Sequence, residues 1–130
     1  MASWDDVRRI AGRLPETDEG TTYGSAAWKV KGKLVVWERP LRTSDLEALG
    51  ADAPQGPILG ARVPDEGVKH ALCADRPDVY FTIPHFDGYA AVLVRLDAID
   101  VGELQELITE AWLDRAPKRL AAQFLAERDG

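Results

Sequence analysis

Cysteine and histidine are scarce in this sequence, which holds one Cys and two His in 130 residues. The single cysteine, Cys73, excludes an intrachain disulfide framework and is typical of a protein in a reducing compartment. A closed structural zinc site takes four Cys or His ligands, so this chain cannot complete one without carboxylates. We therefore expect neither a metal nor a cofactor.

Long apolar segments are absent, because no stretch approaches the roughly 20 apolar residues that a membrane-spanning helix needs. The opening residues, MASWDDVRR, carry acidic side chains where a secretory signal would be basic, and no apolar run follows them. A chain of 130 residues fits one domain. We therefore expect a single domain spanning residues 1–130, located in the cytoplasm.

An excess of positive charge is also missing. Lys and Arg number 16 against 22 Asp and Glu, which gives a net charge of −6 at pH 7. Proteins that coat nucleic acid use Lys and Arg to release counterions from phosphates, and a net negative field opposes such binding. The composition therefore argues against indiscriminate nucleic-acid binding, while a local basic patch can differ from the total.

Familiar catalytic motifs are missing too. No serine stands in a G-x-S-x-G context, and no glycines form a phosphate-binding loop. His85 precedes Asp87 by two residues, a spacing that can orient an imidazole, but the pair can equally satisfy a turn. Cys73 follows His70 by one helical turn, a weak sign of a nucleophile beside the commoner buried thiol. The sequence favours a protein that is not an enzyme.

The segment from Asp78 to Trp112 predicts the nucleus of the fold. Val79, Phe81 and Ile83 alternate with other residues, and Ala90 to Leu96 do the same, which is the two-residue period of strands. Asp87-Gly88 between them predicts a tight hairpin turn. The following helix has one apolar face, with Leu104, Leu107, Ile108, Ala111 and Trp112 on it. A one-faced hairpin and a one-faced helix form a two-layer unit.

The other predicted elements follow the same patterns. One helix is expected after an N-cap at Ser3, and a short one at Asp45–Leu49 after a cap at Thr43 or Ser44. A third is expected at Asp65–Ala74, with Val68, Ala71 and Leu72 facing inward. The last is expected after Ala116-Pro117. Strands are expected in a hairpin over Ala26–Arg39 and at Ile58–Val63, with a loop or edge strand over Glu16–Ser25. Strands joined by tight turns are antiparallel. Helices on one face of such a sheet give an α+β two-layer sandwich.

Basic residues gather in two places. Between Trp28 and Arg42 five bases face one acid, a local charge of +4, and a second cluster follows the long helix. The first cluster is Lys29, Lys31, Lys33, Arg39 and Arg42, and the second is Arg115, Lys118 and Arg119. A basic hairpin can lie along a phosphate backbone as a wing, with the second cluster as a further contact. The alternatives are that edge-strand lysines block aggregation, and that bases near a helix C-terminus stabilise the helix.

Aromatic residues allow a different interpretation. The four tryptophans stand at 4, 28, 37 and 112, where packing in the core is the better explanation. Trp37, Arg39, His85 and Tyr89 could still line a small-molecule pocket. A further alternative is a protein-interaction or chaperone-like module that uses an exposed apolar sheet face and dimerises.

Four segments of the chain form a distinctive set: WERP at 37–40, GPIL at 56–59, TIPHFDGYAAVLVRL at 82–96 and AWLDRAPKRL at 111–120. Together they resemble the MmcQ/YjbR family, in its actinobacterial-type branch. The resemblance covers nearly the whole chain. It implies an α+β fold with the order helix, three strands, helix, two strands, helix, similar to type III secretion chaperones.

For function, this resemblance implies little. Proteins of the family carry the label DNA-binding, from a likeness to a double-wing arrangement, and no enzymatic activity is established for them. No agreed set of functional residues can be transferred from the family. The leading hypothesis from the sequence is therefore DNA binding through the basic hairpin, without catalysis, and the alternatives are a protein partner or a small-molecule ligand.

Overall fold

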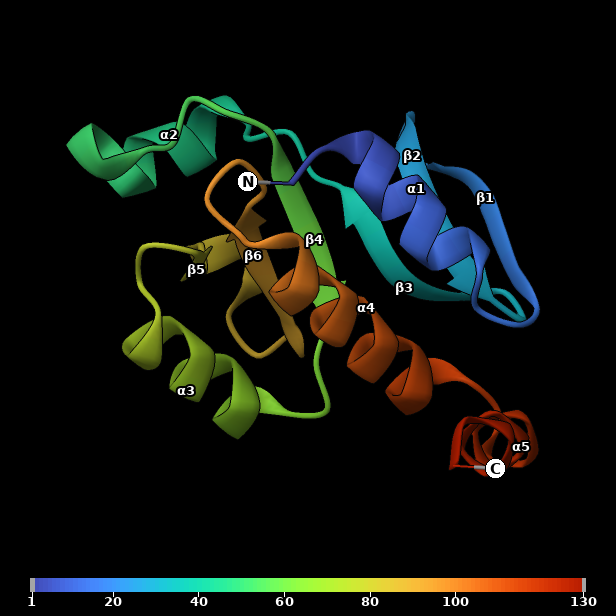
Figure 1. Cartoon of the computed structure of the whole chain (residues 1–130). Helices are drawn as coiled ribbons and strands as arrows, with labels where there is room; N and C mark the ends of the chain where they lie inside the picture. Colours follow the sequence, from blue (N-terminus) through green and yellow to red (C-terminus); the bar gives the residue numbers. More distant parts are fainter. Residues whose placement is uncertain (1, 130) are drawn as a thin grey trace.

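A six-stranded antiparallel sheet runs through the molecule in the order β1-β2-β3-β4-β6-β5 (Figure 1). The computed structural model describes residues 2–129. Its helices are α1 Trp4–Gly12, α2 Thr43–Leu49, α3 Glu66–Asp75, α4 Val101–Arg115 and α5 Lys118–Asp129. Its strands are β1 Thr17–Thr22, β2 Ser25–Val30, β3 Lys33–Glu38, β4 Ile58–Arg62, β5 Tyr80–Phe81 and β6 Ala91–Arg95. The α+β class is confirmed, and the segment over Glu16–Ser25 contains the edge strand β1.

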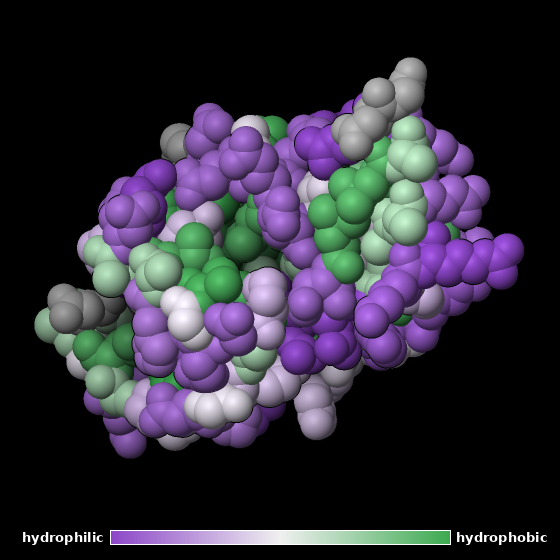
Figure 2. Space-filling view, turned by 90° about the horizontal axis from the view of Figure 1, so that it is seen from below, coloured by the Kyte–Doolittle hydropathy of each residue, from purple (hydrophilic) through white to green (hydrophobic). Residues whose placement is uncertain are grey.

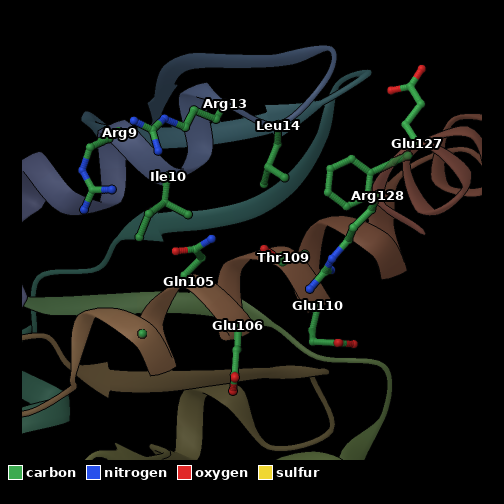
Figure 3. A pocket seen from close by; sticks show the side chains of 12 residues that line it. Arg9, Ile10, Arg13, Leu14, Gln105, Glu106, Thr109, Glu110, Glu127 and Arg128 are labelled. Atoms are coloured by element: carbon green, nitrogen blue, oxygen red, sulfur yellow. The ribbon is translucent and has the colours of Figure 1, made fainter. Parts of the chain in front are cut away.

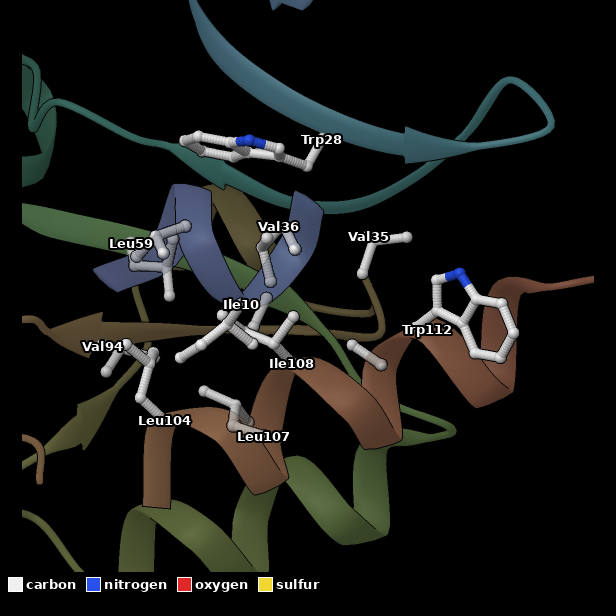
Figure 4. Close-up of a cluster of buried hydrophobic side chains, with 14 of the residues drawn as sticks. Ile10, Trp28, Val35, Val36, Leu59, Val94, Leu104, Leu107, Ile108 and Trp112 are labelled. Atoms are coloured by element: carbon white, nitrogen blue, oxygen red, sulfur yellow. The ribbon is translucent and has the colours of Figure 1, made fainter. Parts of the chain in front are cut away.

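Helices α1 and α4 cover one face of the sheet and enclose the larger core (Figure 4). The strands contribute Trp28, Val36, Leu59 and Val94, and the helices contribute Ile10, Leu104, Leu107, Ile108 and Trp112. The expected inward stripe of α4 is confirmed from Leu104 to Trp112. Within residues 2–129, no helix is long and apolar enough to cross a membrane.

The other face of the sheet is buried as well, which differs from the expected one-sided sheet. A second cluster packs there, with Leu41 and Leu49 against it. Its buried members are Ala27, Trp37, Ile58, Phe81, Ile83, Phe86, Ala91 and Leu93. Strand β6 is therefore apolar on both faces, because alternate residues of it face the two different clusters.

The predicted turn at Asp87-Gly88 is present, with Gly88 at φ 79° and the Tyr89 N–H donating to the Phe86 carbonyl at 2.9 Å, but it does not join the two strands as a tight hairpin. Phe81 pairs with Leu93, and the chain between them folds through a 3-10 turn, η2, at Pro84–Phe86. Pro84 has no N–H to donate to a ladder, and the N–H groups of Phe86 and Asp87 donate to the carbonyls of Ile83 and Pro84 instead. This connection, the 82–90 loop, packs onto the second face of the sheet through Ile83 and Phe86.

Two helix predictions also need correction. Helix α2 begins after Arg42, whose N–H donates to the Asp45 carboxylate at 2.9 Å, so neither Thr43 nor Ser44 is its cap. In α3, Val68 and Ala71 are exposed, and the buried residue is Lys69. Its ammonium donates to the carbonyl oxygens of the 82–90 loop, and the apolar pattern gave no sign of this bond.

The position of the Trp37 side chain depends on Gly60. Gly60 on β4 is the ladder partner of Trp37 on β3. A Cβ added to Gly60 would lie 2.6 Å from Cζ2 and 2.9 Å from Cδ2 of the Trp37 indole. The indole therefore lies across the backbone of β4, in space that any larger residue at position 60 would fill.

Replacement of Gly60 by Ala should destabilise the protein by about 1–3 kcal/mol, because the indole must leave its place over β4. Gly20→Ala on β1 is the matched control, since a Cβ there meets no atom within 4 Å. We expect the control to stay within about 0.5 kcal/mol of the parent protein in urea unfolding. Equal unfolding free energies for the two variants would contradict this role of Gly60.

Candidate functional site

The three hairpin lysines surround the tip of the β2–β3 hairpin and do not share one face. Lys29 pairs with Leu34, and Lys33 pairs with Val30. Because ladder partners point to the same side of a sheet, Lys29 lies on the face of the second cluster and Lys33 on the helix-covered face. Lys31 is in the turn, with φ 49°, and its Nζ is 3.3 Å from a carboxylate oxygen of Glu16.

Arg115 joins the two basic clusters that the sequence shows separately. Its Nε donates to the carbonyl oxygen of Leu34 at 3.1 Å, across 81 residues of sequence. This bond joins the C-terminal end of α4 to the start of β3. Lys118 and Arg119, both exposed in the first turn of α5, follow directly.

Arg62 adds a base that sequence reasoning missed. Its Nε donates to the carbonyl of Ala90 at 2.9 Å, and its guanidinium carbon lies 4.8 Å from the centre of the Tyr89 ring. Burial, and then the nearby positive charge of Arg62, lower the pKa of Arg115. Arg62 has no basic neighbour in the sequence, so only the fold could reveal that it lies close to Arg115.

We call this surface the basic end of the sheet. It consists of Lys29, Lys33, Arg62, Arg115, Lys118 and Arg119. Among residues 2–129, none of these six forms an ion pair with a carboxylate. The arrangement gathers positive charge at one end of an acidic protein, where Asp18 is the ladder partner of Lys29 and Asp114 acts electrostatically on Arg115.

Two of the predicted phosphate contacts lie elsewhere. The side chain of Arg39 is only 8% exposed, and its Nη1 is 3.2 Å from Asp45 and donates to the carbonyl of Pro40. Arg39 is therefore a buried partner of Asp45, against the prediction that it contacts phosphates. Arg42 is exposed, but it lies just before α2. Strand β3 runs from Lys33 to Glu38, so Arg42 follows the end of β3 that is far from Lys33.

The four residues predicted to form a pocket do line one cavity. Trp37, Arg39, His85 and Tyr89 surround a cleft of about 550 Å³ over β3, which we call the β3 cleft. Its other lining residues are Thr22, Tyr23, Ser25, Leu34, Glu38, Pro40, Leu41, Arg42 and Phe86. The β1–β2 turn forms one side, and the 82–90 loop forms the other. Ligand binding in this cleft stays a prediction.

A buried donor lies at the β3 cleft. The Nη2 atom of Arg39 is inaccessible to solvent and has no hydrogen-bond partner within the described residues. The guanidinium carbon is 5.5 Å from the centre of the Phe86 ring, so the ring covers its apolar side. Buried polar atoms almost always have a partner, and this exception belongs to a residue that lines the cleft.

Two further hollows lie on the helix side. One, of about 690 Å³, lies between α1, α4 and α5, with Arg9 and Arg13 opposite Glu106 and Glu110 (Figure 3). The other, of about 700 Å³, lies between α3 and α4. Hydrophobic side chains lie at its bottom in the view from below (Figure 2). Both hollows are open and carry charges of both signs, so neither selects one kind of ligand.

Removing the Asp45 carboxylate should cost about 3–5 kcal/mol of unfolding free energy, because the Arg39 charge would remain buried without its partner. Asp5→Ala is the control, since Asp5 forms an exposed ion pair with Arg8 and such pairs contribute about 1 kcal/mol or less. Chemical denaturation of Asp45→Ala and Asp5→Ala measures both effects. A loss in Asp45→Ala no larger than in the control would show that the buried pair does not hold Arg39.

Comparison with known proteins places these features in a family. Three curated relatives are the uncharacterized proteins Mb2600 of Mycobacterium bovis and MT2646 and Rv2570 of Mycobacterium tuberculosis. Each is 61% identical over 129 residues, covering 97% of this chain and 98% of the relative. Their names assign no function.

A solved structure supports the fold. The crystal structure of Deinococcus radiodurans protein DR2400, of the DUF419 domain family, matches with a TM-score of 0.65. It is 21% identical, and the match covers 87% of this chain and 78% of that one. The sequence model of the YjbR family matches residues 12–113, which include the sheet and most of α4. The chain belongs to the YjbR family.

Proposed function

We propose that this protein binds nucleic acid, in the first instance DNA, through the basic end of the sheet and without catalysis. The bond from Arg115 to the Leu34 carbonyl carries this proposal, because it makes one surface of two clusters that lie far apart in sequence. Phosphate binding needs several bases within reach of one backbone. The basic end offers six.

The charges of the basic end support contact with phosphates. Arg62 and Arg115 repel each other electrostatically and neither forms an ion pair with a carboxylate, so a phosphate that contacts both would relieve this repulsion. Lys31 adds a seventh base, because its exposed pair with Glu16 contributes little and a phosphate can replace it. The hairpin tip then presents bases on both of its sides, as a wing does.

The protein-interaction alternative has less support. It depends on an exposed apolar sheet face, and both faces of the sheet are buried over β3, β4 and β6 within the described residues. The large apolar side chains that are exposed lie on separate elements. They are Tyr23, Leu46, Val68, Tyr89 and Leu125. A particle mass above 14.3 kDa in solution would revive this alternative.

Binding to a labelled DNA duplex should weaken with salt. Four to five phosphate contacts give a slope of log affinity against log salt near −4, at about 0.9 per contact. The double variant Lys33→Glu/Lys118→Glu removes two exposed bases and should make this slope shallower, from near −4 to about −2. Fluorescence anisotropy across a salt series measures both values.

The control for this experiment reverses two bases elsewhere. Arg8→Glu/Arg9→Glu makes the same change in net charge on α1, where both arginines form exposed ion pairs. We expect the control to keep the parent slope and to lose affinity only through the long-range field. No binding at low salt, or equal loss of slope in both variants, would overturn the proposal.

A further inference from the structure

The β3 cleft has the size and lining of a site for a small planar group. Its volume of about 550 Å³ is within the range of small-molecule pockets. Leu34 and Leu41 give it apolar walls, and the aromatic residues Trp37 and Phe86 lie at its floor, each 5% exposed. An apolar, aromatic lining with few polar groups favours a ring over a flexible chain.

The polar groups of the cleft select a hydrogen-bond acceptor without much charge. Asp45 already compensates the positive charge of Arg39, and the rest of the lining holds one further base, Arg42, and one acid, Glu38. The unpartnered Nη2 of Arg39 would therefore orient a ligand through a hydrogen bond more than attract it by charge. A carbonyl oxygen or ring nitrogen meets this requirement, and a free phosphate would find little net attraction here.

Aromatic side chains stand exposed at both rims of the cleft. Tyr23 is 94% exposed in the β1–β2 turn, at φ 48°, and Tyr89 is 37% exposed in the 82–90 loop. Tyr23 and Gly24, at φ 48° and 81°, are the two central residues of the β1–β2 hairpin turn, so the turn type accounts for this backbone conformation and leaves the ring exposed. Tyrosine rings at the rims of a cleft can cover the faces of a flat ligand.

The cleft and the basic end meet at two residues. Tyr89 lines the cleft and lies under the guanidinium of Arg62. Leu34 lines the cleft with its side chain and accepts the hydrogen bond of Arg115 with its carbonyl. A strand whose phosphates contact the basic end would therefore have a base within reach of the cleft.

From this geometry we infer that the β3 cleft binds one unpaired nucleobase, hydrogen-bonded to Arg39 and flanked by Tyr23 and Tyr89. For a base within a strand, the inference rests on the proposed function, and for a free nucleoside it stands alone. Bases in a duplex are paired and stacked, so the cleft makes the protein prefer single strands. The 82–90 loop and its buried lysine, Lys69, position the wall of the site.

The test compares strands with and without bases. Labelled oligothymidylate, an abasic strand of equal length and a duplex are titrated by anisotropy, and free thymidine by calorimetry. We expect oligothymidylate to bind about tenfold more tightly than the abasic strand, since one stacked base contributes a factor of this size. The duplex, whose bases are paired, should bind through phosphate contacts alone, with the salt dependence expected for a duplex.

Two variants assign this difference to the cleft. Ser25→Trp fills the cleft from β2, and Thr21→Trp places the same side chain on the opposite face of the hairpin, because Thr21 pairs with Ala26. Ser25→Trp should reduce oligothymidylate binding to the abasic level, and Thr21→Trp should not. Arg39→Lys keeps a charge beside Asp45 but loses the planar second donor, and should weaken thymidine binding.

The outcomes separate the two proposals. Equal binding of base-bearing and abasic strands by the parent protein would overturn the nucleobase site and leave the basic end standing. Thymidine binding that Ser25→Trp abolishes, with no strand bound at any salt concentration, would support the nucleobase site and overturn the proposed function. No binding of thymidine or of any strand would overturn both.

Discussion

A buried lysine holds the second face of this protein together. Lys69 is 1% exposed, and its ammonium lies 2.6 Å from the carbonyl oxygen of Phe86 and 2.9 Å from that of Tyr89. Glu66 stands 3.3 Å away and supplies the opposite charge. A buried ammonium costs several kcal/mol unless it is paired and hydrogen-bonded, so the 82–90 loop and α3 must stay in this arrangement together. The wall of the β3 cleft, with Phe86 and Tyr89 on it, depends on that bond.

The residues of this wall contact both the β3 cleft and the basic end of the sheet, the two proposed sites. Phe86 packs against Trp37, with ring centres 6.2 Å apart, and covers Arg39. Trp37 reaches its position because Gly60 leaves space over β4. On the other side, Tyr89 lies beneath Arg62 at the basic end. The cleft and the basic end are therefore built from the same packed residues, and a change in the 82–90 loop would alter both.

The sequence predicted the elements whose signals are local. Helix α1 follows from Ser3 and its apolar stripe, and the β2–β3 hairpin follows from alternation around Gly32. The course of the 82–90 loop was missed, because it is fixed by Lys69, which lies 17 and 20 residues before its two acceptors. For the basic end, the sequence predicted most of the residues but not the contact that brings them together. Its residues carry a compositional signal, except Arg62, but the contact that joins them spans 81 residues.

Net charge and local charge act over different distances in this protein. At physiological salt the field of an exposed charge falls off within about 8 Å, so an approaching phosphate responds mainly to the bases it touches. The carboxylates that make the chain acidic include Glu106 and Glu110 on α4, which line the hollows of the helix side and are absent from the lining of the β3 cleft. The net charge of −6 therefore opposes long-range association with phosphates, while the proposed contact at the basic end depends on the arginines and lysines gathered there. For the proposed ligand, contacts in the β3 cleft would therefore add to those of the phosphates, which on their own must work against the overall field.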